Sequence, residues 1–124
     1  IFAAKTALDE IDFLDPAKIF LVQLADFMWQ ETRTFEERMT TARTFRVFPG
    51  EGVHSEALVE LVLKLERLGY DGDYSFEVFN DDYVNLPLPV VCERARRSAI
   101  WLSEDVLRRS TPLPNAMRLK ARPA

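Results

Sequence analysis

Short apolar runs alternate with amphipathic stretches along the chain. The apolar runs predict three strands, at residues 19–25, 44–48 and 74–79. The first run, IFLVQLA, is apolar almost throughout, which is typical of a strand buried on both faces. Apolar residues recur at helical spacing over residues 2–13, 55–68 and 89–107. Because strands alternate with helices, the pattern predicts parallel β/α units.

Proline, glycine and serine residues predict where these elements begin and end. Pro49 and Gly50 end the second strand, because proline cannot donate to a strand ladder and glycine allows a tight turn. Ser55 is predicted to cap the amino end of the next helix, and Gly69 its carboxyl end. For residues 27–43, whose pattern is mixed, we expect a loop followed by a short or irregular helix.

The composition narrows the classes of function. With 48% apolar and 29% charged residues, the 124-residue chain is typical of one soluble globular domain. Its 16 basic and 20 acidic residues give a net charge of −4, which argues against nucleic-acid binding. One cysteine excludes an internal disulfide, and no apolar run reaches the roughly 18 residues of a membrane helix. We therefore expect a cytoplasmic protein without nucleic-acid or membrane partners.

The two ends of the chain bear on its organisation. The chain begins with Ile1 rather than Met, so we expect a piece of a longer protein. Residues 1–107 are predicted to form the folded domain. Residues 108–124 are predicted to form a basic, proline-containing tail.

Polar side chains interrupt the predicted strands. Gln23 and Glu77 lie near the carboxyl ends of the first and third strands, and Arg46 lies in the second. In one interpretation, Gln23 and Glu77 give oxygen ligands to a divalent metal, and Arg46 binds an anionic substrate. In the other, Glu77 and Arg46 form a buried ion pair between neighbouring strands, and Gln23 bonds to backbone. The residues alone leave both interpretations open.

Three segments around these residues resemble the last three β/α units of the xylose-isomerase-like TIM barrels. They are residues 18–26 (KIFLVQLAD), 46–52 (RVFPGEG) and 69–81 (GYDGDYSFEVFND). The resemblance covers roughly residues 1–103 and implies the carboxyl-terminal part of a (β/α)₈ barrel. A whole barrel needs about 250 residues.

The resemblance implies a metal site. In this family four side chains from different strands, namely a Glu, an Asp, a His or Gln, and a last Glu, hold one divalent metal ion, for which we expect Mg, Mn or Co. Gln23 matches the third ligand, on what would be strand 6, and Glu77 the fourth, on strand 8. Arg46 matches an arginine that faces the substrate. The first two ligands and the catalytic base have no counterpart in this chain.

The resemblance also implies an activity. Gln at the third ligand position is similar to the 3-dehydroshikimate dehydratases, so we expect dehydration of 3-dehydroshikimate to protocatechuate. A sugar or sugar-phosphate isomerase or epimerase on the same fold is the alternative. A non-catalytic, truncated barrel fragment is the second alternative. The 124-residue piece alone is expected to be inactive, and to associate with the missing part of the barrel or with itself.

Other residues are weaker candidates. His54, the only histidine, suits acid–base chemistry, but an exposed position before a helix is the favoured interpretation. Glu51 is interpreted as a turn carboxylate or as a group that orients a substrate hydroxyl. Phe27 and Trp29 either wall a pocket or pack a loop. Cys92 is predicted to be a buried, small apolar residue.

Overall fold

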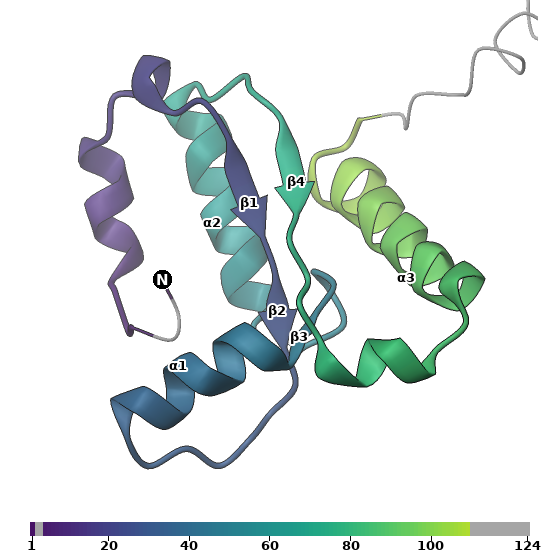
Figure 1. The fold of residues 1–124 in the computed structure, drawn as a ribbon. Coiled ribbons are helices and arrows are strands. Elements are labelled where there is room, and N and C mark those ends of the chain that lie inside the picture. Colours follow the sequence, from purple (N-terminus) through teal and green to yellow (C-terminus); the bar gives the residue numbers. More distant parts are fainter. Residues whose placement is uncertain (2–3, 110–124) are drawn as a thin grey trace, which may run out of the picture.

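The computed structural model describes residue 1 and residues 4–109 (Figure 1). Four short strands alternate with helices along this part of the chain. The strands are β1 (Val22–Leu24), β2 (Asp26–Phe27), β3 (Arg46–Val47) and β4 (Tyr74–Phe76). The α-helices are α1 (Phe35–Thr44), α2 (Ser55–Leu68) and α3 (Leu88–Ile100), which continues as a π-helical segment, Trp101–Val106. Short 3₁₀ helices span Leu8–Phe13, Pro16–Lys18 and Asp81–Asn85.

The strands β1 and β4 lie side by side and run in the same direction, with α2 packed along one face (Figure 1). Three pairs set the register: Val22 with Tyr74, Gln23 with Ser75, and Leu24 with Phe76. Side chains alternate between the two faces of a strand. Leu24 and Phe76 therefore point towards α2, where both belong to the core or pack against it. Gln23, Ser75 and Glu77 lie on the opposite face.

The second predicted strand is wrong as a parallel barrel strand. Only Arg46 and Val47 are extended within residues 44–48, and they pair antiparallel with Phe27 and Asp26. The β-forming composition of TFRVF favours extended backbone, but Pro49 and Gly50 stop it before a ladder can grow. Because β1 pairs directly with β4, these two are adjacent barrel strands. Gln23 and Glu77 therefore come from neighbouring strands, with no third strand between them.

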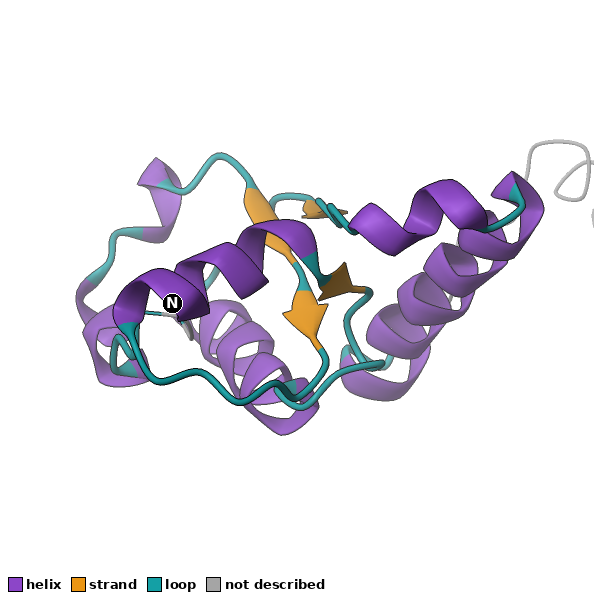
Figure 2. Cartoon of the chain, turned by 60° about the horizontal axis from the view of Figure 1, so that its bottom comes forward, coloured by secondary structure: helices purple, strands orange, loops and turns teal. Residues whose placement is uncertain are grey.

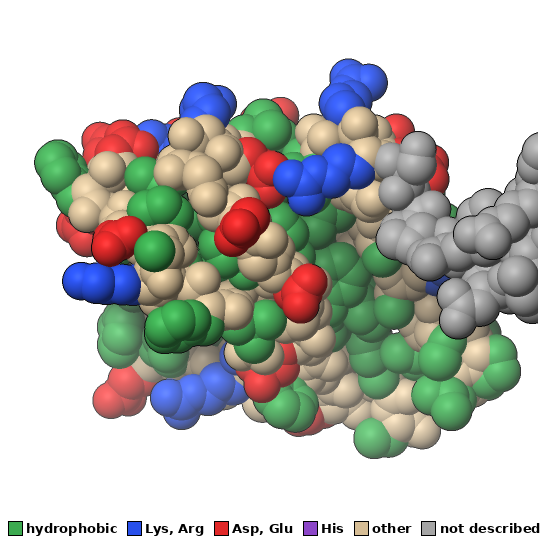
Figure 3. All heavy atoms as spheres, turned by 90° about the horizontal axis from the view of Figure 1, so that it is seen from above, with side chains coloured by type: hydrophobic (Ala, Val, Ile, Leu, Met, Phe, Trp, Pro, Cys, Tyr) green, Lys and Arg blue, Asp and Glu red, His purple; other side chains and the backbone are tan. Residues whose placement is uncertain are grey.

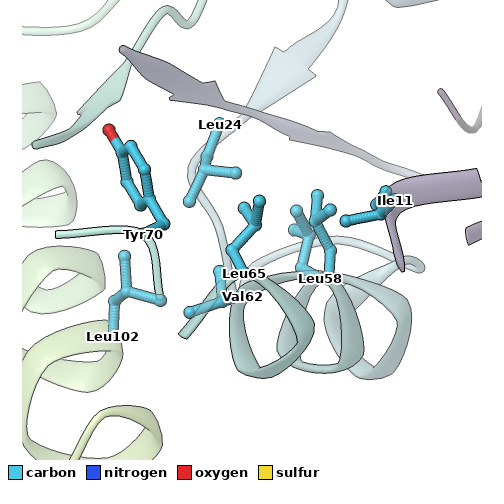
Figure 4. Packing of buried hydrophobic residues seen from close by; sticks show 8 residues of the cluster. Ile11, Leu24, Leu58, Val62, Leu65, Tyr70 and Leu102 are labelled. Carbon is cyan, nitrogen blue, oxygen red and sulfur yellow. The ribbon is translucent and has the colours of Figure 1, made fainter. Parts of the chain in front are cut away.

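The core lies between the β1–β4 pair and α2 (Figure 4). Its buried residues come from the first 3₁₀ helix, β1, α2, the turn after α2 and the π-helical segment: Ile11, Leu24, Leu58, Leu61, Val62, Leu65, Tyr70 and Leu102. Half of them lie on one stripe of α2, as the helical spacing of its apolar residues predicts. Gly69 ends α2 in the left-handed conformation, with φ of 100°, which confirms the predicted carboxyl cap.

One helix differs from the expectation. The predicted helix over residues 2–13 is a 3₁₀ helix at Leu8–Phe13 that buries only Ile11, so little packing stabilises a longer helix there. The loop and short helix expected over residues 27–43 are present, and the helix is α1. Thr34 accepts a hydrogen bond from Glu37 N, and Glu37 accepts one from Thr34 N, which is a capping box. The T-x-x-E pattern at 34–37 carries this signal in the sequence.

Several large apolar side chains lie open to solvent. Phe20, at the start of β1, is 87% exposed, and Val84 and Leu88 are also exposed. Seen from above, apolar side chains gather in the middle of the surface while acidic and basic ones scatter over one side (Figure 3). Cys92 is exposed, which corrects the prediction that it is buried. The predicted tail lies outside the described residues from residue 110 onward. Within the described part, no helix has the length and apolar character to cross a membrane.

Replacing Leu58 by Ala tests the core. Leu58 is 2% exposed and lies on the α2 stripe, so Leu58→Ala is expected to lower the free energy of unfolding by about 2–5 kcal/mol. Urea denaturation followed by far-UV circular dichroism measures it. Val84→Ala, at an exposed position, is the control and should change stability by less than about 0.5 kcal/mol. Equal effects of both changes would contradict this core.

The capping box predicts a pH dependence of α1. Hydrogen bonds from Arg33 N and Thr34 N hold the pKa of Glu37 below its usual value of 4.5. Because the pKa of Glu37 is lower in the folded state, its ionised carboxylate stabilises the fold at pH values above the unfolded pKa. This stabilisation is lost as pH falls through the folded pKa. The protection of the α1 amides, taken as their exchange rate relative to the intrinsic rate at the same pH, should therefore fall below about pH 4. The variant Glu37→Gln should show a weaker dependence, and an unchanged pH profile in it would contradict this role.

Candidate functional site

The three residues singled out from the sequence line one cavity. Gln23, Glu77 and Arg46 surround an open cavity of about 290 Å³, together with Leu24 and Ala25. The parallel pairing of β1 with β4 places Gln23 and Glu77 on the same face, close to the carboxyl ends of the two strands. In β/α folds this is the end that carries the chemistry.

Arg46 binds Glu77. Arg46 Nη1 donates to Glu77 Oε2 at 2.9 Å and to the Glu77 carbonyl at 3.0 Å, and Arg46 Nε donates to the Ala42 carbonyl at 2.5 Å. The pair is only partly buried, because the Glu77 side chain is 44% exposed. The ion pair between Glu77 and Arg46 that the second interpretation expected is thus present, but it is not buried. The pair joins the end of β4 to β3, and these two strands are not parallel neighbours in one sheet.

The structure leaves polar atoms facing this cavity. Gln23 is exposed, and its side chain makes no hydrogen bond with the described residues, so the expected bond to backbone does not form. Arg46 uses Nε and Nη1, and its Nη2 has no partner within the described part of the chain. An amide oxygen, a carboxylate and a guanidinium nitrogen therefore converge on one space.

Contacts with the segment after β4 hold Arg46 in place. Arg46 N donates to the Phe79 carbonyl at 2.9 Å, and the Asn80 side-chain amide donates to the Arg46 carbonyl at 2.8 Å. The Arg46 guanidinium lies 5.5 Å from the centre of the Phe79 ring, within the range of a cation–π contact. One edge of β3 is thereby tied to the chain that follows Glu77, through both backbone groups of Arg46.

Asp26 organises the loop beside the site. Its carboxylate is 0% exposed and accepts hydrogen bonds from Phe27 N at 2.8 Å, His54 N at 3.1 Å and the Ser55 hydroxyl at 3.4 Å. This carboxylate caps α2, and His54 rather than Ser55 is the cap residue, which corrects the predicted cap. A buried carboxylate at a helix amino end is favoured by the helix dipole. The sequence signal was an acid directly after a buried strand, and its role was missed.

The other candidates have structural contacts. Glu51 accepts from Phe48 N at 2.9 Å and binds Arg94 through two hydrogen bonds of 2.7 and 3.1 Å, which joins the Pro-Gly turn to α3. These bonds raise the pKa of Arg94, and burial raises the pKa of Tyr83, whose ring lies under the Arg94 guanidinium. His54 lies against Asp26 and Phe27, outside the Gln23 cavity.

The cavity holds two oxygen donors of the kinds that bind divalent metals. Oxygen donors from Gln and Glu suit Mg²⁺ or Mn²⁺, which take several such ligands. In the part of the chain that the structure describes, no cluster of three or more His, Cys, Asp or Glu residues could hold a metal. Gln23 and Glu77 therefore fit two positions of a larger ligand set.

Comparisons with known proteins agree with this arrangement. Over 98 residues the chain is 35% identical to a 3-dehydroshikimate dehydratase of Pseudomonas aeruginosa, covering 77% of this chain and 14% of that protein. The crystal structure of IolI, a TIM barrel solved with a zinc atom, superposes with a TM-score of 0.63 and 20% identity. The superposition covers 84% of this chain and 34% of IolI. No protein-family profile matches the chain.

The chain has the fold of part of a TIM barrel and is similar to proteins of the xylose-isomerase-like group. The comparison thus confirms the partial barrel expected from the sequence. The chain spans about a seventh of the dehydratase and about a third of IolI. Within the described residues β1 and β4 pair directly, and α2 is the helix that precedes β4.

Removing the Asp26 carboxylate tests its structural role. Asp26→Ala leaves buried donors on Phe27 and His54 without an acceptor, so the free energy of unfolding is expected to fall by about 1–3 kcal/mol. Gly52→Ala should also destabilise, because a Cβ there would lie 2.5 Å from Asp26 Cγ and 2.6 Å from the Phe27 carbonyl.

Chemical denaturation measures both changes against Asp71→Ala, an exposed turn position. That control is expected to stay within about 0.5 kcal/mol of the unaltered chain. Unaltered stability of Asp26→Ala would show that this carboxylate does not hold the loop.

Proposed function

We propose that Gln23 and Glu77 are two ligands of a divalent metal ion in a lyase of the xylose-isomerase-like group, and that the reaction is dehydration of 3-dehydroshikimate to protocatechuate. The observation that carries the proposal is their convergence, since adjacent parallel strands aim both side chains into one cavity. The similarity to a 3-dehydroshikimate dehydratase supports the choice of reaction. The remaining ligands belong to residues outside this chain.

The two ligands differ in charge. Glu77 supplies a carboxylate, and Gln23 supplies a neutral amide oxygen that cannot titrate. A divalent ion bound between them, as Mg, Mn or Co, would polarise a substrate carbonyl and so ease loss of the neighbouring proton. Arg46 restrains the Glu77 carboxylate through Nη1 and holds the Glu77 backbone as well.

Arg46 has a second part in the proposal. Arg46 lines the cavity and its Nη2 has no protein partner among the described residues, so this nitrogen is suited to donate to a substrate carboxylate. Dehydration by elimination removes a proton from one carbon and a hydroxyl from the next. The cavity residues of this chain bind and orient the substrate, and the base lies elsewhere in the barrel.

The alternative on the same fold is a sugar isomerase or epimerase. Passing a proton between two faces of a carbon uses a pair of acid–base groups, one on each side. Glu77 is the carboxylate among the five residues that line this cavity. This favours the lyase. A non-catalytic fragment that associates with the rest of a barrel or with itself is the second alternative. The exposed side chains of Phe20 and Leu21, which lie just before β1, support such an association.

A metal titration tests the ligand assignment. Mn²⁺ binding to the chain, followed by electron paramagnetic resonance, is expected to weaken at least about tenfold in Glu77→Gln, which loses the negative charge of the carboxylate ligand, and in Gln23→Ala, which loses an oxygen ligand. Asp82→Asn, an exposed acid close to the end of β4, is the matched control and should bind as the unaltered chain does.

The same variants in the whole parent protein test the reaction. Protocatechuate formation from 3-dehydroshikimate should be lost with Glu77→Gln and kept with Asp82→Asn. Undiminished Mn²⁺ binding in both ligand variants would overturn the metal assignment. Metal binding without protocatechuate formation would overturn the proposed reaction but not the assignment of the metal ligands.

A further inference from the structure

A second cavity lies on the other side of the β2–β3 ladder. It has a volume of about 340 Å³, within the range of small-molecule sites. It lies among the start of the chain, the segment after β2, α1 and the beginning of α2, which meet at one end of the molecule (Figures 1 and 2). Ten residues line it: Lys5, Phe27, Met28, Trp29, Gln30, Thr32, Arg38, Thr41, Val53 and His54. None of them lines the Gln23 cavity.

Its walls are apolar and aromatic without belonging to the core. Phe27, Met28 and Trp29 follow one another along the chain, and none is a member of the core cluster. Trp29 is 73% exposed and Met28 is 54% exposed. The Phe27 and His54 rings contact each other at 4.6 Å between centres. Packing therefore does not account for this run of large side chains, and a planar apolar ligand would cover it.

The charges of this cavity are opposite to those of the chain. Lys5 and Arg38 line it and no Asp or Glu does, although the whole chain carries −4. The nearby acids Glu31, Glu36 and Glu37 line a neighbouring hollow, which shares Gln30, Thr32 and Thr41 with this cavity. Close to the amino end of α2, a carboxylate is already present, because Asp26 accepts a hydrogen bond from His54 N. The positive character thus comes from the two side chains.

A hydrogen-bonding group completes the lining. The buried Thr41 hydroxyl donates to Gln30 Oε1 at 3.1 Å, which fixes the amide. The Gln30 Nε2 group then has no partner among the described residues, and can donate to an oxygen of a ligand. Aromatic walls, two cations and an oriented amide donor together suit an aromatic ring that carries an anionic oxygen pair.

We propose that this cavity is a binding site for a small aromatic carboxylic acid, separate from the Gln23 and Glu77 cavity. Lys5 and Arg38 offer charge-assisted hydrogen bonds to the carboxylate, and Phe27, Met28 and Trp29 contact the ring. The apolar walls disfavour inorganic phosphate, which would leave them uncovered. The site does not depend on the metal assignment, because the two cavities share no residue.

Calorimetric titration of the 124-residue chain with benzoate tests the proposal. Benzamide, which has the same ring without the charge, should bind at least about tenfold more weakly, the order expected for loss of one charge-assisted hydrogen bond. Cyclohexanecarboxylate, which lacks the flat ring, and inorganic phosphate should also bind more weakly. Equal binding of benzoate and benzamide, or no benzoate binding at millimolar concentration, would overturn it.

Variants place the binding in this cavity. Arg38→Gln and Trp29→Ala should each weaken benzoate binding about fivefold or more, since one removes a cation and the other an exposed wall that the core does not need. Arg43→Gln, an exposed arginine of α1 that does not line the cavity, is the matched control and should bind as the unaltered chain does.

Glu77→Gln separates this proposal from the metal site. Benzoate binding should persist in Glu77→Gln, even where Mn²⁺ binding is lost. If benzoate binding fell in Glu77→Gln and stayed unchanged in Arg38→Gln, the ligand would occupy the first cavity and the second site would be refuted.

Discussion

The parallel pairing of β1 with β4 joins two segments that lie far apart in the sequence, and it decides where every other part lies. The pairing turns Leu24 and Phe76 towards α2 and builds the core on that side. It also turns Gln23 and Glu77 to the opposite side, into one cavity. A shift of the β4 segment by one residue would exchange its two faces and turn the Glu77 carboxylate towards the core. The large cost of burying that carboxylate stabilises the observed register.

The loop between these strands depends on a different interaction. Asp26 is buried at the end of β1, and its carboxylate takes hydrogen bonds from the backbone at both ends of the loop, at Phe27 and at His54. A charge with no exposure is stable only where donors surround it, so the loop must close around Asp26. Glu51 and Arg94 then join the turn at its far end to α3. The segment between Phe27 and His54 can therefore be long and still hold Arg46 in a fixed position.

Arg46 connects the ion-pair and metal-ligand interpretations of Glu77. The guanidinium contacts one carboxylate oxygen, Oε2, at 2.9 Å, and the other oxygen is not used by this pair. A carboxylate can accept bonds from an arginine and from a metal at the same time, because it has about four lone-pair positions. The Arg46 contact and a metal role for Glu77 are thus compatible. A second arrangement of the same kind of chemistry, two cations beside aromatic walls, lies across the β2–β3 ladder and faces away from this one.

The sequence by itself determined the local elements and the identity of the polar residues. The α2 stripe, the Gly69 cap and the positions of β1 and β4 follow from spacing and from glycine geometry, which act over a few residues. The T-x-x-E capping box of α1 was equally local. Only the tertiary structure decided that residues 44–48 are not a parallel strand, that Asp26 caps α2, and that Arg46 contacts Glu77. The physical reason is that strand pairing and the burial of charge depend on which distant segment supplies the partner, and local sequence preferences do not identify it.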